Sequence, residues 1–253
     1  MLGILVSLAV GGAVFLAAFS AIHHSIGAGI VWSLPTLVAT FIVVGRRAAK
    51  RVEPLVAESQ KHVQAGRIEK AVETLKSGFA VARWHPLLPG QLHAQIGILL
   101  YIAGKPDEAL PHLLKASRFV WLAPAMLGCL FWRKKEPKKM RAAFEKAVRA
   151  GKKDSLAWTV YAYCLRESGQ KEEAIKVLER GAKALKKPDH RLQTNLERLR
   201  DGKPLKTAPY GEQWLQFRLD KAPPPIGKGP RGPQLDPNHP ALRGLRGRRA
   251  RHM

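Results

Sequence analysis

One pattern of small and large residues recurs four times between residues 52 and 188, and it constrains the fold more than any other feature of the chain. The residue that opens the second helix of each expected unit is small or flexible, and these residues are 38, 31 and 34 positions apart: Ala71, Ala109, Met140 and Ala174. Small residues stand seven positions later, at Gly78, Ala116, Ala147 and Gly181, and twelve positions earlier, at Ser59, Gly97, Gly128 and Ala162. Large apolar residues stand four positions later, at Leu75, Leu113, Phe144 and Leu178. The expected turns hold Gly66, Gly104, Lys135 and Gly169.

Packing explains these columns. Two antiparallel helices approach closely only where their side chains are short, and a large residue beside each short one fills the neighbouring space. Glycine in the turn allows the first helix to end in a left-handed conformation. Pro106 and Pro137 stand where second helices begin, a position at which the missing N–H costs nothing. The pattern therefore predicts four helical hairpins.

The spacing and the columns resemble the tetratricopeptide repeat family. The fourth unit, SLAWTVYAYCLRESGQKEEAIKVLERGAKAL, and the second, LHAQIGILLYIAGKPDEALPHLLKAS, match it best. The third departs from it at Lys135 and Met140, and the first at Glu58 and His62. The resemblance implies an all-α fold over residues 52–201, a solenoid of about four repeats with a capping helix, and a protein-binding role without a chemistry of its own. The alternative is a helical bundle without repeat symmetry.

The N-terminal segment, residues 1–45, contains no Asp, Glu, Lys or Arg. The run MLGILVSLAVGGAVFLAAFSAI is long enough to cross a bilayer as a helix, and AGIVWSLPTLVATFIVV reaches the short end of that range. We expect a transmembrane helical hairpin, because a signal peptide needs a positively charged start and leaves the second run unexplained. A signal peptide or a single anchor is the alternative. His23 and His24 are expected to form a solvated turn, since no third metal ligand is near.

A basic juxtamembrane segment, residues 46–51, follows directly. Its cations are Arg46, Arg47, Lys50 and Arg51. Positive residues beside a span stay on the cytoplasmic side, which predicts an inner-membrane protein of bacterial type with its repeats in the cytoplasm. The same cations would contact anionic lipid headgroups.

The charge balance of the chain is strongly basic, with a formal net charge of +24, and it implies an anionic partner. Between Arg133 and Lys153 ten Lys or Arg face two Glu, so this stretch is either a solvated face or an anion-binding surface. The only two cysteines, Cys129 and Cys164, are spaced neither as a metal knuckle nor as a redox pair and are expected to be buried thiols.

The first helices of such repeats line a concave groove, and the resemblance places ten side chains there. They are Gln60, Val63, Ile98, Tyr101, Ile102, Cys129, Trp132, Arg133, Tyr163 and Arg166. Aromatic and Arg residues dominate binding energy at protein interfaces, so the groove suits an extended or helical peptide. The alternative is that these side chains pack against the chain's own C-terminal segment.

Three further segments close the chain. Residues 189–201 read as an amphipathic capping helix with Asp189 as its N-cap. Residues 202–220 contain APYGEQWLQFRLD, which is too apolar for a free linker and is expected to dock. Residues 221–253 are rich in Pro and Gly, end in basic residues and are expected to be disordered.

No catalytic, cofactor or metal motif is present in the sequence. The nine His are not spaced with Cys, Asp or Glu as ligands are, and there is no phosphate-binding loop or nucleophile elbow. We therefore expect a membrane-anchored, non-enzymatic scaffold that recruits a protein through its groove, a layout shared with bacterial envelope-assembly factors. The alternative is a protein that binds anionic lipid or nucleic acid through its basic surfaces and tail, although a specific nucleic-acid site is not expected because the tail lacks stacking aromatics.

Overall fold

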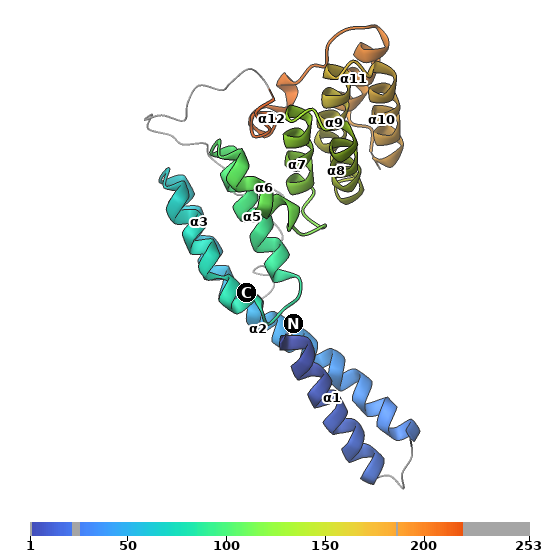
Figure 1. The fold of residues 1–253 in the computed structure, drawn as a ribbon. Coiled ribbons are helices and arrows are strands. Elements are labelled where there is room, and N and C mark those ends of the chain that lie inside the picture. The colour runs from blue at the N-terminus through green and yellow to red at the C-terminus, as the bar shows by residue number, and fades with distance from the viewer. Residues whose placement is uncertain (1, 22–25, 186, 220–253) are drawn as a thin grey trace, which may run out of the picture. The chain divides into compact units, whose positions relative to one another are not determined.

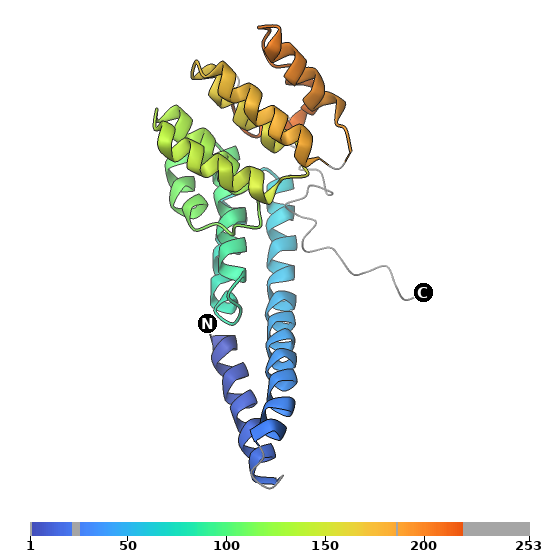
Figure 2. The same cartoon turned by 90° about the vertical axis from the view of Figure 1, so that its right-hand side faces the viewer.

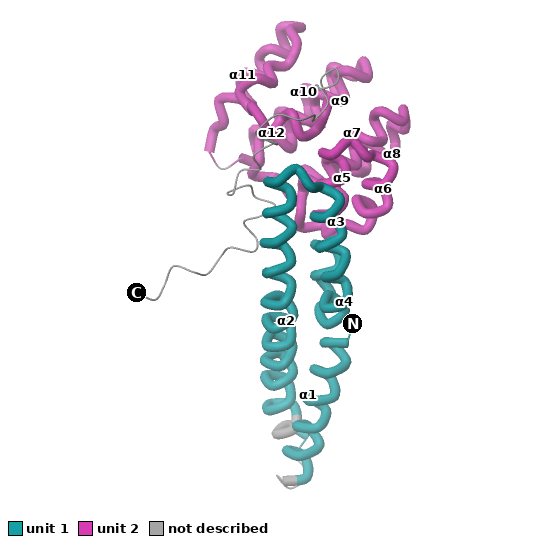
Figure 3. The backbone as a smooth tube through the Cα atoms, turned by 90° about the vertical axis from the view of Figure 1, so that its left-hand side faces the viewer, with its two compact units in different colours: residues 1–92 teal, residues 93–253 magenta. Residues whose placement is uncertain are grey.

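The computed structural model describes residues 2–21, 26–185 and 187–219, and every regular element in them is helical. These residues form two compact units, Met1–Leu92 and His93–Met253, which are coloured separately in Figure 3. The predicted His23–His24 turn and the predicted disordered tail over residues 221–253 lie outside the described residues.

Unit 1 begins with a helical hairpin formed by α1 (Leu2–Ala21) and α2 (Ile26–Gln64), as Figure 1 shows. Both helices are long and apolar enough to cross a membrane, with a mean hydropathy of 2.4 for the α1 span and 1.3 for the α2 span. The second helix continues without a break through the basic residues 46–51 and ends at Gln64. The predicted first helix of the first repeat is therefore the C-terminal half of α2.

The first hairpin of the repeat region is completed by α3 (Ile68–Ser77), which Gly66 connects to α2 with a positive φ of 72°. The hydroxyl of Ser59 donates to the carbonyl oxygen of Ala71 at 3.1 Å and joins the two helices where both residues are small. A short α4 (Phe79–Ala82) and a connection over residues 83–87 lead to α5 (Leu88–Ile102). The connection begins the run WHPLLPG (residues 84–90), whose two prolines predict an interruption of helix between the first and second repeats. This prediction is wrong for Pro89, which lies in the first turn of α5, because a first helical turn accepts a residue without an N–H.

Unit 2 holds three more hairpins, an additional helix and a short docked segment (Figure 2). The first hairpin pairs α5, which crosses the boundary between the units, with α6 (Pro106–Leu114). The second pairs α7 (Leu122–Arg133) with α8 (Pro137–Ala150), and the third pairs α9 (Ser155–Glu167) with α10 (Lys171–Ala184). After α11 (His190–Arg200) come a 3-10 turn, η1 (Ala208–Tyr210), and α12 (Glu212–Leu215).

The turn and cap residues behave as the sequence predicts. Gly104 and Gly169 have positive φ values of 82° and 78°, and Lys135 adopts the same left-handed conformation, with φ 56°, at the third turn. Pro106 and Pro137 open α6 and α8. The Asp189 carboxylate accepts hydrogen bonds from the backbone N–H groups of Arg191 and Leu192, which confirms the predicted N-cap of α11.

The small and large columns meet in the core of unit 2. A Cβ added at Gly97 would lie 2.8 Å from the Leu113 side chain, and one added at Gly128 would lie 2.7 Å from the Phe144 ring. The Trp158 ring packs equally closely on Gly181. Each glycine therefore admits the large side chain of its partner helix, which is the packing that the columns predicted.

Candidate protein-binding site

The inner surface of unit 2 is occupied by the segment that follows α11, here named the C-terminal strap (residues 204–219). Its Trp214 and Phe217 are only 2% and 0% exposed. The Trp214 ring meets the Tyr163 ring edge-on, with 5.0 Å between centroids. The Tyr101 hydroxyl donates to the Phe217 carbonyl oxygen at 2.6 Å. Side chains from α5 and α9 thus hold one segment from the far end of the chain.

Arginine side chains fix the end of the strap. The Arg218 guanidinium donates to the carbonyl oxygen of Ile102, the last residue of α5, at 3.0 Å. A second arginine, Arg133, donates from its guanidinium to the Arg218 carbonyl oxygen. The same guanidinium lies 6.0 Å from the centroid of the Tyr101 ring. Burial, with the nearby Cys129 thiol, raises the pKa of Tyr101 well above its ordinary value, so its hydroxyl stays a neutral donor.

Polar contacts secure the first half of the strap to α9 and α11. The Asn195 amide donates to the Lys206 carbonyl oxygen at 3.2 Å and accepts from the Lys206 N–H at 2.6 Å. The hydroxyls of Tyr210 and Thr159 are 2.8 Å apart. The Arg191 guanidinium lies 4.9 Å from the centroid of the Tyr210 ring, a cation–π distance. The Lys206 backbone and the Tyr210 hydroxyl therefore have hydrogen-bond partners, as polar groups in a protein core do.

The structure brings four of the eight predicted groove residues of unit 2 onto this strap. The side chains of Tyr101, Arg133 and Tyr163 contact the strap directly. The backbone carbonyl oxygen of Ile102 accepts a hydrogen bond from the Arg218 side chain of the strap. Ile98 and Cys129 are buried, and Arg166 pairs with its neighbour Glu167. In unit 1, Val63 is buried and Gln60 is half-buried. The chain's own C-terminal segment therefore covers part of the surface predicted to be the groove.

The two cysteines have no access to solvent. Both thiols are 0% exposed, on α7 and α9. Burial, and next the hydrogen bond with Cys129, raise the pKa of Cys164 well above its ordinary value. The burial predicted for both cysteines is confirmed, and enclosed thiols are poor nucleophiles and poor metal ligands.

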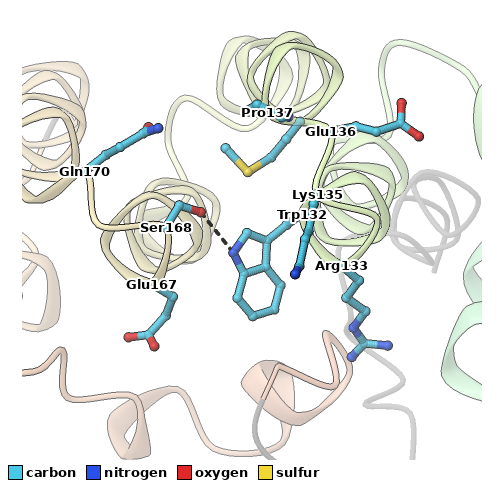
Figure 4. Close-up of a pocket in the computed structure, with 9 residues that line it drawn as sticks. Trp132, Arg133, Lys135, Glu136, Pro137, Glu167, Ser168 and Gln170 are labelled. Atoms are coloured by element: carbon cyan, nitrogen blue, oxygen red, sulfur yellow. Dashed lines mark hydrogen bonds between the residues drawn. The ribbon is translucent and has the colours of Figure 1, made fainter.

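One pocket of unit 2 stays open beside the strap, at the ends of α7 and α9 (Figure 4). Its volume is about 600 Å³. It is lined by the last turns of these helices and the start of α8, namely Trp132, Arg133, Lys135, Glu136, Pro137, Met140, Glu167, Ser168 and Gln170. The indole N–H of Trp132 donates to the Ser168 hydroxyl at 3.1 Å, which holds the half-buried ring between the ends of α7 and α9.

The sequence identified only Trp132 and Arg133 of this pocket. The other lining residues were missed because they lie in or beside the turns between paired helices, where the repeat pattern explains Lys135, Pro137 and Met140 by turn formation and packing and does not indicate a binding site. The available clue is the recurrence of turns at fixed intervals, since the turns of adjacent repeats lie next to each other in a repeat stack. An aromatic face, an Arg, a Lys, two Glu and a buried Met equip the pocket to hold a side chain of mixed character.

The predicted membrane and anion contacts lie on α2. Arg46, Arg47, Lys50 and Arg51 are all exposed and directly follow the apolar half of that helix. Within the described ranges, no group of three or more His, Cys, Asp or Glu is arranged to hold a metal ion.

Comparison with known proteins supports the family expected from the repeat columns. A family model described as tetratricopeptide repeat matches residues 156–184, which cover almost all of α9 and α10. A search of curated proteins finds no match to the chain. The matched unit is therefore similar to a tetratricopeptide repeat, a class of helical hairpins that mediates binding between proteins.

Proposed function

We propose that the chain is a membrane-anchored adaptor that binds a segment of another protein at the pocket around Trp132. The hairpin of α1 and α2 is the anchor, and unit 2 supplies the binding surface, in a bacterial inner membrane with the repeats on the cytoplasmic side. The open pocket beside a filled groove carries the proposal. While aromatic and polar contacts close the groove, this pocket still offers a partner an accessible aromatic side chain with charged neighbours inside a cavity.

The predicted groove enters this proposal as an extension of the pocket. Arg133 lines the pocket and also binds the strap, so the two sites share a side chain. A partner that displaces the strap would gain Ile98, Tyr101, Ile102, Tyr163 and Arg166 as further contacts. A partner that leaves the strap in place would use the pocket alone, as a short segment bound at modest affinity.

Site-specific photo-crosslinking in native membranes tests the pocket. A crosslinking residue replaces the exposed Lys135 at the pocket, and in a matched chain it replaces the exposed Lys146 on the outer face of α8. We expect one protein to be captured from position 135 and not from position 146. The substitution Trp132→Ala should abolish that capture, whereas Phe119→Ala, which removes a 60% exposed ring outside the pocket, should not. Equal capture in all of these chains would contradict the pocket as the binding site.

A second candidate function, binding to anionic lipid or nucleic acid, is favoured by the outer face of α8. The two acids of this stretch are already engaged, Glu136 with Lys139 at 2.5 Å and Glu145 with Arg180 at 2.9 Å. Five further exposed cations stand on α8 or directly after it and outnumber these two acids: Lys138, Lys146, Arg149, Lys152 and Lys153. Their field would attract a polyanion in a salt-dependent manner.

Binding to anionic vesicles and to RNA by the full chain, held in nanodiscs of neutral lipid, tests this second function. We expect binding to weaken steeply between about 50 and 200 mM salt if electrostatic contacts carry it. The substitutions Lys146→Glu and Arg149→Glu should remove it without affecting the Lys135 crosslink. Binding that is unchanged by salt and by both substitutions would exclude the α8 face.

A further inference from the structure

The connection between α4 and α5, residues 83–87, packs against the hairpin within unit 1. The backbone N–H of Leu2 donates to the Arg83 carbonyl oxygen at 3.2 Å, and the Trp84 carbonyl lies against Gly3. Figure 3 shows α4 following α1 along the same side of α2. The start of α1 and the connection therefore occupy one level of unit 1.

The other side of the connection meets α2 at the same level. The His85 ring lies 5.5 Å from the Phe41 ring, measured between centroids. A Cβ added at Gly45 would come within 2.6 Å of the His85 ring, so the imidazole rests directly on the helix backbone there. Glycine at position 45 is what allows this close approach.

The charge pattern of the chain changes at this level. No Asp, Glu, Lys or Arg occurs before Arg46, and Arg47 follows at once. In a membrane-spanning helix, such a transition marks the border between the hydrocarbon core and the lipid headgroups. The contacts with Leu2, Phe41 and Gly45 place the connection at that border.

The connection has the composition that this border favours. Trp84 and Leu87 are large apolar residues that remain 39% and 46% exposed, and Arg83 is exposed beside them. No Asp or Glu occurs between Glu73 and Asp107. Tryptophan is enriched at headgroup depth, because its ring is apolar while its N–H still forms hydrogen bonds, and Arg is attracted to anionic headgroups.

We propose that residues 83–87 form an interfacial segment that inserts Trp84 and Leu87 among the lipid headgroups, with Arg83 against lipid phosphates. This inference rests on the proposed membrane anchoring of α1 and α2 and adds a third contact to it. Two helices alone leave unit 1 free to tilt in the bilayer. A segment bound at the surface restricts that tilt and sets the level at which the first repeat leaves the membrane.

Spin labels at four positions of the full chain in anionic nanodiscs test the proposal. Single cysteines replace Trp84, Leu87, Leu34 in the apolar half of α2, and Gln64 at its end. Gln64 is 19 residues beyond Gly45, about 28 Å along the helix. The native thiols of Cys129 and Cys164 are buried, and the unsubstituted chain measures any background labelling. Each label reports its collision rates with oxygen, which concentrates in lipid, and with a water-soluble nickel complex.

We expect the ratio of oxygen to nickel collisions to be highest at Leu34, intermediate at both Trp84 and Leu87, and lowest at Gln64. The Leu87 label leaves the indole of Trp84 in place, so it controls for loss of the proposed anchor. Ratios at positions 84 and 87 equal to that at Gln64, with Leu34 in lipid, would overturn the interfacial segment alone. A water-exposed label at Leu34 would instead overturn the anchoring of the hairpin.

Discussion

At single positions, the stability of unit 2 depends on glycines that accept a large neighbour. Gly128 is the clearest case, because the Phe144 ring that would meet its Cβ at 2.7 Å is itself fully buried. We expect Gly128→Val to lower the free energy of unfolding by about 1–3 kcal/mol, the usual range for overpacking a core. Urea denaturation followed by circular dichroism measures it. Ala142→Val, on the exposed face of α8, should change stability by no more than about 0.5 kcal/mol, and an equal loss in both variants would refute the packing argument.

The carboxylate that caps α11 should make stability depend on pH. Burial alone would raise the pKa of Asp189, but hydrogen bonds from Arg191 and Ser155 outweigh it and lower the pKa from 3.8 to about 2. A lowered folded-state pKa stabilises the fold above the unfolded value, and this contribution is lost as the pH falls from about 4 to about 2. Asp189→Asn keeps a capping oxygen but removes the charge. We expect the variant to be less stable than the parent in urea at pH 7, with the difference disappearing near pH 2. A difference that stays constant over this range would contradict the ion pair.

The sequence predicts the conformation of a residue well where that conformation depends on the residue's own backbone or capping chemistry. The Gly turns, the Pro residues that open α6 and α8 and the Asp189 cap all follow from local backbone chemistry. The pocket around Trp132 could not be predicted in the same way. Its members Glu136, Ser168 and Gln170 become neighbours only because the turn after α7 and the turn after α9 lie side by side.

Among the elements, the strap is held by a few large side chains and should detach when one is lost. Trp214 is 2% exposed and contacts the rings of Tyr163 and Tyr210. Truncating a buried aromatic side chain costs about 3–5 kcal/mol, which exceeds what a 16-residue peripheral segment is expected to retain. We expect Trp214→Ala to open the strap, seen as faster hydrogen exchange over residues 204–219 and faster tryptic cleavage after Lys206.

A neighbouring residue of the same helix provides the control. Leu215 is also in α12 but is 54% exposed, so Leu215→Ala should leave exchange and cleavage unchanged. Trp214→Ala should leave the exchange of α8 and α10 unchanged as well, because those helices do not depend on the strap for their own packing. Equal protection of residues 204–219 in the parent and in Trp214→Ala would show that the backbone contacts from Asn195 and Tyr101 suffice without the indole.

The limits of sequence reasoning at this scale are visible in α2 and in the strap. Composition divides residues 26–64 into an apolar, a basic and an amphipathic part, yet one helix runs through all three, because helical hydrogen bonding does not depend on polarity. The aromatic residues of the strap predict docking. They do not say whether the surface they cover belongs to this chain or to a partner, since the same apolar burial drives both.

For the whole molecule, the proposed anchoring makes a prediction about the side of the membrane that the repeats occupy. Four cations directly follow the candidate span of α2, and positive residues within about 15–20 positions of a span hold their side in the cytoplasm. In vesicles from a bacterial expression host, we expect trypsin to digest unit 2 in inverted vesicles and to leave it intact in right-side-out ones. A C-terminal epitope tag reports the outcome.

Charge reversal shows whether those four cations cause the orientation. Replacing Arg46, Arg47, Lys50 and Arg51 with Glu should give a mixed population in which part of unit 2 is digested in right-side-out vesicles. The matched variant reverses four exposed cations of α8, Lys138, Lys139, Lys146 and Arg149, which lie too far from the span to direct insertion. It should keep the parental orientation. If both variants behave alike, the net charge of the molecule rather than the juxtamembrane segment governs its topology, and the assignment of residues 46–51 as the orienting element fails.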